Sequence, residues 1–212
     1  MIDNIKVFKH NSIFIKTGFG AVYIDPFQMD EEPHDAAYIF ITHEHYDHFS
    51  PEDIEKVSGN NTILVVPEKM ERKAQEVAGI VKNIKTVKPG TYFKINDLEF
   101  ETVSAYNILK PFHPKSAEWV GYILLVDGQR IYIAGDTDAT KEAKEAKCDI
   151  ALVPIGGTYT MDAKKAAELV NTIRPCIAIP VHYGSIVGNV SDADLFAQYV
   201  KEPVKVEFKI SF

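Results

Sequence analysis

The run Thr42-His43-Glu44-His45-Tyr46-Asp47-His48 organises the rest of the chain, because it places three imidazoles and the carboxylate of Asp47 within six positions. It follows the largely apolar residues 36–41, which predict a buried strand. It precedes Ser50-Pro51-Glu52-Asp53, a typical helix start with a capping serine and a proline at the first helical position. The run therefore lies where a strand ends and a helix begins.

The donors in this run favour a metal site, since imidazole and carboxylate groups bind zinc, iron and manganese. His43 and His45 are two positions apart, so in an extended segment their side chains point the same way, toward one ion. Asp47 and His48 follow as the chain turns into the helix, which can aim them at a second ion.

Composition predicts one soluble globular domain. The 212 residues are 46% hydrophobic and 25% charged, and the net charge of −7 argues against a general binder of nucleic acid or anionic membranes. No apolar run approaches the ~20 residues of a membrane span, and residues 1–4 lack the start of a signal peptide, so we expect a cytoplasmic location. Cys148 and Cys176 are expected to be buried, unpaired thiols.

The patterns along the chain predict short strands that are linked by hairpins at first and alternate with helices later. Residues 104–118 have no strand or helix period and predict a loop over the site. A pair of mixed sheets with helices outside satisfies this order. The expected strands are 5–8, 12–15, 21–24, 36–41, 63–66, 84–87, 92–95, 98–103, 119–126, 130–134, 150–154, 176–180 and 204–208, and the expected helices begin at Pro51 or cover 67–79, 141–147, 161–173 and 191–200.

Two further strand ends carry possible ligands. Asp136 follows residues 130–134, and His182 follows residues 176–180. Asp136 alone would be read as a helix cap and His182 alone as a hydrogen-bonded histidine, but together with residues 42–48 they are better explained by one site. Asp25 also ends a strand, where it is either a turn former or a support for the metal ligands.

These residues resemble the metallo-β-lactamase fold superfamily. The resemblance rests on the motif at 42–48, Gly-Asp-Thr at 135–137, His182 and Asp25, and it spans nearly the whole chain. Within the superfamily the chain is similar to the short metal-dependent hydrolases related to the ascorbate 6-phosphate lactonase group, a similarity that the stretch 156–161 shares. The resemblance implies an α/β (α+β) fold, a four-layer αββα sandwich formed by a single domain over residues 1–212, with a dinuclear site at the shared edge of its sheets.

The resemblance also implies which residues bind the ions. It puts His43 and His45 on the first ion, Asp47, His48 and His182 on the second, and Asp136 between them. Asn107 stands where most members carry another histidine for the first ion. Either Asn107 supplies a weaker carbonyl ligand or His113 supplies the nitrogen, and His113 could instead touch substrate. His10 and His34 match no motif and are expected at the surface.

The mechanism expected for such a site is hydrolysis by a hydroxide that bridges two divalent ions. Zinc is the first expectation for both ions, with manganese, iron and nickel as alternatives. Asp47 or Asp136 would accept or shuttle a proton. The pocket-lining candidates, each of which could equally be an ordinary core or rim aromatic, are Tyr106, Trp119, Tyr159 and Tyr183.

The expected substrate is a small ester, lactone or phosphoester, with no membrane partner and with the oligomeric state open. A phosphodiesterase or nuclease is the second reading, which the acidic balance disfavours. A metal-binding protein without hydrolytic activity is the third, motivated by Asn107 at the usual histidine position.

Overall fold

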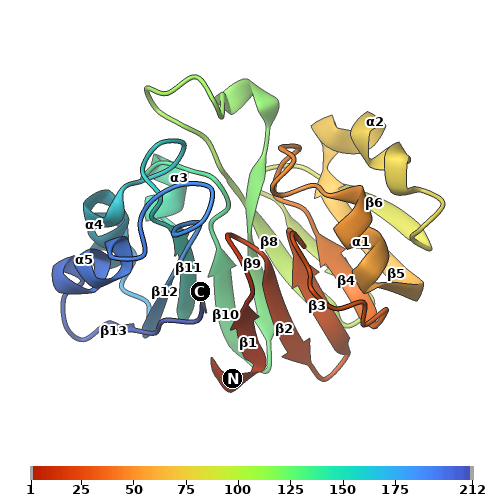
Figure 1. Cartoon of the computed structure of the whole chain (residues 1–212), viewed down its shortest axis with the longest axis horizontal. Coiled ribbons are helices and arrows are strands. Elements are labelled where there is room, and N and C mark those ends of the chain that lie inside the picture. The colour runs from red at the N-terminus through yellow and green to blue at the C-terminus, as the bar shows by residue number, and fades with distance from the viewer. Residues whose placement is uncertain (1, 211–212) are drawn as a thin grey trace.

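Two β-sheets packed face to face form the middle of the molecule in the computed structural model, which describes residues 2–210 (Figure 1). One cluster of buried side chains lies between the sheets, a second lies between one sheet and its helices, and a third lies between the other sheet and its helices. The predicted αββα sandwich of the metallo-β-lactamase fold is confirmed.

The first sheet is built from the N-terminal half and keeps its strands in chain order. β1, β2 and β3 are antiparallel, and β4, β5 and β6 continue in parallel. Short turns join the antiparallel strands, whereas the parallel pairs need longer connections. The strands are β1 (Ile5–Val7), β2 (Ile13–Thr17), β3 (Gly20–Ile24), β4 (Ala36–Phe40), β5 (Ser58–Pro67) and β6 (Asn83–Val87).

The second sheet contains the remaining strands in the spatial order β13-β12-β11-β10-β9-β8-β7. β7 to β10 are antiparallel neighbours, and β10 to β13 are parallel. The strands are β7 (Tyr92–Ile95), β8 (Leu98–Ser104), β9 (Val120–Val126), β10 (Gln129–Ile133), β11 (Ile150–Pro154), β12 (Ile177–Val181) and β13 (Lys205–Val206).

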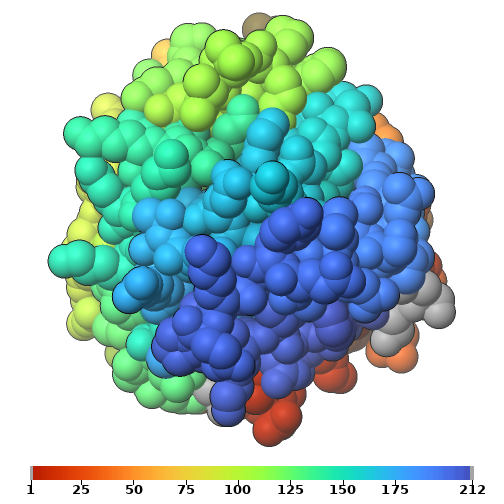
Figure 2. All heavy atoms as spheres, turned by 90° about the vertical axis from the view of Figure 1, so that its left-hand side faces the viewer, coloured from red at the N-terminus to blue at the C-terminus, as the bar shows by residue number. Residues whose placement is uncertain are grey.

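Helices cover the outer face of each sheet. α1 (Pro51–Val57) and α2 (Glu71–Ala74) lie beside the first sheet, and α3 (Lys141–Lys144), α4 (Ala163–Ile173) and α5 (Asp192–Tyr199) lie beside the second (Figure 1). Seen from the side of α4 and α5, the surface consists largely of the C-terminal half of the chain, coloured green to blue (Figure 2). Ser50 caps α1 as predicted, since its side chain accepts a hydrogen bond from the Asp53 amide.

Three predicted helices differ in detail, the first of which is α3, which ends at Lys144 rather than at Lys147. Residues 67–79 form not one helix but a broken run, with 3-10 turns at Glu68–Met70 and Gln75–Val77 on either side of α2, and no side chain caps any of these pieces. Ser191 does precede α5, but its side chain makes no capping hydrogen bond. The Asp192 carboxylate instead accepts from the Asn189 amide at 2.7 Å, which fixes the approach to the helix.

The prediction for the cysteines is partly wrong. Both thiols are free, but Cys176 is exposed and Cys148 only half-buried. Cys176 lies just before β12 rather than inside it, where the chain has not yet entered the sheet. None of the helices in the described part of the chain has the length and apolar character that a bilayer crossing needs.

One tyrosine ties the two sheets together near the site. Tyr122 of β9 is fully buried between the sheets, where its ring packs on Phe40 with centroids 4.9 Å apart. Its hydroxyl donates a 2.6 Å hydrogen bond to the carbonyl oxygen of Ile41, the residue before the Thr42–His48 run. The second sheet thereby helps to fix where the ligand motif of the first begins.

We expect Tyr122→Phe to lower the free energy of unfolding by about 1–3 kcal/mol, because the buried Ile41 carbonyl loses this donor. Urea denaturation of the metal-free chain would measure the change. Tyr199→Phe, at an exposed position on α5, is the matched control and should leave the midpoint within error. Equal midpoints for the two variants would contradict the role of the Tyr122 hydroxyl.

Candidate metal centre

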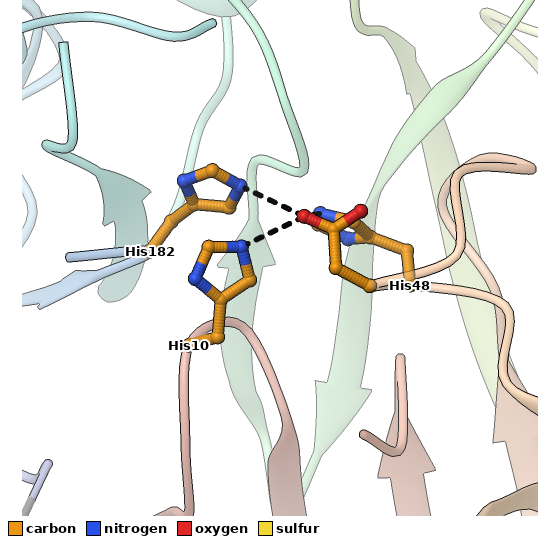
Figure 3. Close-up of side chains that lie close together, drawn as sticks. His10, His48 and His182 are labelled. Atoms are coloured by element: carbon orange, nitrogen blue, oxygen red, sulfur yellow. Dashed lines mark hydrogen bonds and ion pairs between the residues drawn. The ribbon is translucent and has the colours of Figure 1, made fainter. Parts of the chain in front are cut away.

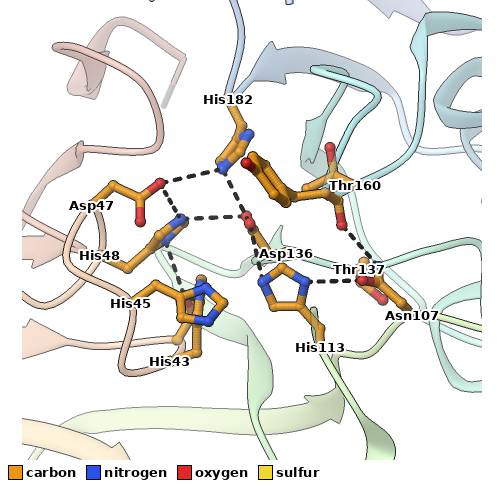
Figure 4. Close-up of polar contacts among 12 residues, drawn as sticks. His43, His45, Asp47, His48, Asn107, His113, Asp136, Thr137, Thr160 and His182 are labelled. Atoms are coloured by element: carbon orange, nitrogen blue, oxygen red, sulfur yellow. Dashed lines mark hydrogen bonds and ion pairs between the residues drawn. The ribbon is translucent and has the colours of Figure 1, made fainter. Parts of the chain in front are cut away.

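The predicted ligands come together at one edge of the two sheets, as Figure 4 shows. His43, His45, Asp47 and His48 follow β4, while Asp136 and His182 follow β10 and β12. β10 and β12 run in the same direction within the second sheet, so their carboxyl ends meet at the same edge. The order of strands therefore explains why residues far apart in sequence meet here.

The first group consists of His43, His45 and His113, each with a ring nitrogen within 4.8 Å of the others. His43 Nε2 and His45 Nδ1 are 3.1 Å apart. The buried Trp119 ring packs against all three, with centroid distances of 5.1, 5.0 and 5.5 Å. Trp119 is thus a wall of this group, one of the two readings the sequence left open.

Between Asn107 and His113 as the missing ligand, the geometry favours His113. The Asn107 side-chain oxygen lies 3.0 Å from His113 Nδ1, and its amide nitrogen donates to the Tyr159 carbonyl at 2.9 Å. With both ends engaged, Asn107 holds the proton of His113 on Nδ1, which leaves the lone pair on Nε2. That Nε2 faces Asp136, 3.3 Å from its Oδ2.

The second group contains Asp47, His48 and His182. Nε2 of His48 and Nε2 of His182 lie 3.8 and 4.0 Å from Oδ2 of Asp47. Asp136 stands between the groups, with Oδ1 3.4 Å from His48 Nε2 and Oδ2 3.1 Å from His182 Nε2 and 3.3 Å from His113 Nε2. One carboxylate therefore faces both groups.

Divalent ions fit this arrangement of donors. Several buried side-chain atoms at its centre have no hydrogen-bond partner within residues 2–210, namely His48 Nε2, His113 Nε2, His182 Nε2 and Asp136 Oδ1. An unsatisfied buried polar atom costs ~1–3 kcal/mol, so several of them converging on one region require an explanation. Lone pairs of imidazole and carboxylate that converge in this way are suited to bind metal ions.

Asp25 fixes the orientation of His48. Its fully buried carboxylate lies 2.7 Å from His48 Nδ1 and accepts hydrogen bonds from the Thr42 amide at 2.8 Å and the Thr42 hydroxyl at 2.6 Å. A carboxylate on the far nitrogen of a histidine sets its tautomer and presents the other nitrogen as a ligand. Of the two roles that the sequence left open for Asp25, support of the ligands is the one its contacts show.

The charges in the centre depend on one another. Burial alone would lower the pKa of His48, but the carboxylates of Asp136 and Asp25 outweigh it and raise the pKa to about 9. Burial would raise the pKa of Asp136, but the neighbouring His182 and His48 hold it well below its usual range. The metal-free centre thus keeps a proton on His48, which an ion bound there would displace.

His10 is the residue that sequence reasoning missed. It was expected at the surface, but it is buried, and its Nε2 lies 3.0 Å from Oδ2 of Asp47 (Figure 3). The turn between β1 and β2 points it inward with a φ of 58°. The sequence did contain a signal for this role, namely a histidine, an asparagine and a serine in a row between two apolar strands. His34 is exposed, as expected, with its side chain 52% accessible.

The other aromatic candidates for lining the pocket differ in their contacts and exposure. Tyr106 donates a 2.9 Å hydrogen bond to Glu142 of α3, so its hydroxyl is engaged outside the ligand groups. Tyr183 is buried, and Tyr159 is exposed. Glu44 and Tyr46, between the ligands of the motif, are also exposed.

Comparison with known proteins identifies what this chain is similar to. Residues 4–182 match the family described as the beta-lactamase superfamily domain. A UPF0173 protein of Pyrococcus abyssi is 32% identical over 187 residues, which cover 86% of this chain and 84% of the relative. A UPF0173 metal-dependent hydrolase of Thermoplasma acidophilum is 33% identical over 205 residues, with coverage of 87% and 85%. A crystal structure from Parabacteroides distasonis superposes with a TM-score of 0.80 at 30% identity and covers 97% of this chain and 91% of its own.

We expect Asp25→Asn to weaken binding of the ion held by His48 about 10–100-fold, because the substitution removes the charge that fixes the His48 ring. Titration of the metal-free chain with zinc against a competing chelator would measure both affinities. Asp97→Asn, at an exposed hairpin position, is the control and should bind as the wild-type chain does. Unchanged affinities in Asp25→Asn would show that His48 does not need this partner.

Proposed function

Because the chain belongs to the metallo-β-lactamase superfamily, we propose that it is a metal-dependent hydrolase that cleaves a small ester, lactone or phosphoester. The observation that carries the proposal is the position of Asp136, whose two oxygens lie within 3.4 Å of nitrogens from both ligand groups. A shared carboxylate of this kind suits a centre with two neighbouring ions.

The proposed centre divides its ligands between two divalent ions. His43, His45 and His113 would hold the first, and Asp47, His48 and His182 the second, with Asp136 shared. Bound ions would supply Lewis acidity, polarising the substrate carbonyl or phosphoryl group and acidifying the attacking water. Zinc suits these donors, as do manganese, iron and nickel.

The two carboxylates differ in what they can do. Asp136 is almost fully buried among three histidines, so it is suited to hold its neighbours in place. The Asp47 side chain is 13% exposed, and we assign to it the transfer of a proton between the site and solvent. Burial would raise the pKa of Asp47, but the hydrogen bond from His10 and the charge of His48 lower it to about 2. Asp47 is therefore ionised at neutral pH, the form in which a carboxylate binds a metal ion.

Apolar side chains around the site favour a substrate with an apolar group. Six of the twelve large exposed hydrophobic residues in the described chain lie on the loops that carry or adjoin the ligands, namely Tyr46, Ile108, Leu109, Phe112, Tyr159 and Ile186. Two of these loops touch, since the rings of Phe112 and Tyr159 lie 4.7 Å apart. Exposed apolar groups gathered in this way are typical of binding surfaces. We propose that they contact an alkyl, acyl or aryl group beside the bond that is cleaved.

The same loops disfavour nucleic acid as substrate. Lys110 is a basic residue among these apolar positions, and Asp138 neutralises it with a 2.6 Å ion pair. With a net charge of −7 as well, the chain offers little attraction to a phosphate backbone. The alternative of a metal-binding protein without hydrolytic activity is less favoured, because in the proposed centre His113 would supply the nitrogen that Asn107 cannot.

We expect the metal-loaded chain to hydrolyse at least one member of a panel of lactones, carboxylic esters, thioesters and phosphodiesters. His48→Ala should reduce the rate to background, since it removes a ligand of the second ion. Chelation should abolish the activity and zinc or manganese should restore it. His34→Ala is the control at an exposed histidine. Full activity in His48→Ala would exclude the proposed mechanism.

We expect Leu109→Ser to raise KM about 10-fold for an ester with a long acyl chain and to leave KM for the acetyl ester unchanged, because only the long chain would reach the loop. Steady-state kinetics across a series of acyl lengths would measure the effect. Leu195→Ser, at an exposed position on α5, is the matched control. A uniform change across the series would contradict an apolar contact at Leu109.

A further inference from the structure

The turn between β1 and β2 packs against the second ligand group, although no metal-site motif includes it. His10, Asn11 and Ser12 are all buried in this turn. Asn11 donates a 2.8 Å hydrogen bond to Asp25, the residue that fixes His48. The turn therefore touches the ligands' supports and, through His10, the ligands themselves.

His10 contacts two members of the second group. Its Nε2 lies 3.0 Å from Oδ2 of Asp47 with the geometry of a hydrogen bond. Its ring lies beside that of His182 (Figure 3), with the centroids 3.7 Å apart. Its carbonyl oxygen accepts a 2.8 Å hydrogen bond from the His182 amide. One residue thus holds the side chain of Asp47 and both the backbone and the ring of His182.

The partner of His10 Nε2 fixes the role of that nitrogen. The carboxylate oxygen Oδ2 of Asp47 lies 3.0 Å from it and can only accept, so Nε2 of His10 is the donor. Nε2 of His48 and of His182, by contrast, have no hydrogen-bond partner in the described chain and remain available as ligands.

The backbone supports a specific role at this position. His10 and His182 both adopt left-handed conformations, with φ of 58° and 59°. Such values cost energy for residues other than glycine and persist where the surrounding structure imposes them, often at functional sites. At His10 this conformation directs the side chain inward, toward Asp47 and His182.

We propose that His10 is a positioning residue of the second metal site, which holds Asp47 through Nε2–H and braces His182 through its ring and carbonyl oxygen. The inference rests on the proposed metal centre. It assigns His10 no bond to the ion. Its effect is to restrict Asp47 and His182 to the orientation in which they bind, so its loss should weaken the second ion and spare the first.

Two substitutions separate the positioning role from a merely structural one. His10→Gln can return an N–H at nearly the reach of Nε2, whereas the amide of His10→Asn is too short to reach Asp47. Asparagine tolerates the left-handed backbone well, so His10→Asn keeps the turn. His34→Asn is the matched control at the exposed histidine, which also has a positive φ, of 48°.

The experiment is titration of the metal-free full chain with cobalt(II), followed by its absorption spectrum, and with zinc against a chelator. We expect His10→Asn to lose about 10–100-fold in affinity for the second ion while keeping the first. His10→Gln should recover most of that loss and give the wild-type cobalt spectrum. Melting of each variant in excess chelator would show that the metal-free fold is retained.

The alternative outcomes are distinct. Wild-type affinity for both ions in His10→Asn would overturn the inference. A weakened second site in both variants, with a changed cobalt spectrum in His10→Gln, would show that His10 is itself a ligand and also overturn it. Failure of the wild-type chain to bind a second ion would instead refute the proposed centre, independently of His10.

Discussion

The buried carboxylate of Asp25 is the constraint on which the site depends. It ends β3 and accepts hydrogen bonds from the Thr42 amide and hydroxyl and from Asn11, while it lies 2.7 Å from Nδ1 of His48. An ionised group without access to water is expensive unless such partners surround it. Asp25 therefore depends on its hydrogen-bond donors, and the donors are in turn held in the positions that Asp25 requires. It joins the β1–β2 turn, β3 and the start of the ligand motif into one unit.

The second sheet and the loop after β8 supply the remaining donors of the site. Asp136 and His182 come from β10 and β12, and His113 comes from the loop that follows β8. The Tyr122 hydroxyl, bonded to the Ile41 carbonyl, fixes the two sheets against each other next to the motif. Packing between the sheets thus determines how far the two sets of donors lie from one another. Changes in the core between the sheets would therefore alter the geometry of the centre, although none of its ligands belongs to that core.

The parts of this structure that sequence could predict are those governed by local pattern. The αββα layers follow from strand periodicity and from the change from hairpins to alternating helices. The motif at 42–48 is compact enough to be recognised on its own, and Asp136 and His182 were found because each follows an apolar strand. The predictions that failed concern features that depend on backbone torsions and on contacts with residues distant in sequence. The polar run at 10–12 marks an unusual turn, but it does not specify the φ of 58° that points His10 inward. Choosing between Asn107 and His113 required the positions of Tyr159 and Asp136, which no spacing supplies.

The division of the donors between the sheets also determines at which stage of its synthesis the protein can bind metal. Residues up to His48 provide one side of the centre, but the other side is complete only when His182 has joined β12 in the second sheet. A chain emerging from the ribosome in sequence order can fold its first sheet early. It cannot assemble the full set of donors until synthesis has passed His182. In the proposed two-ion centre, loading of both ions would therefore be a late event in biogenesis, and a nascent chain that stops short of β12 would leave the histidines of the first sheet without their partners.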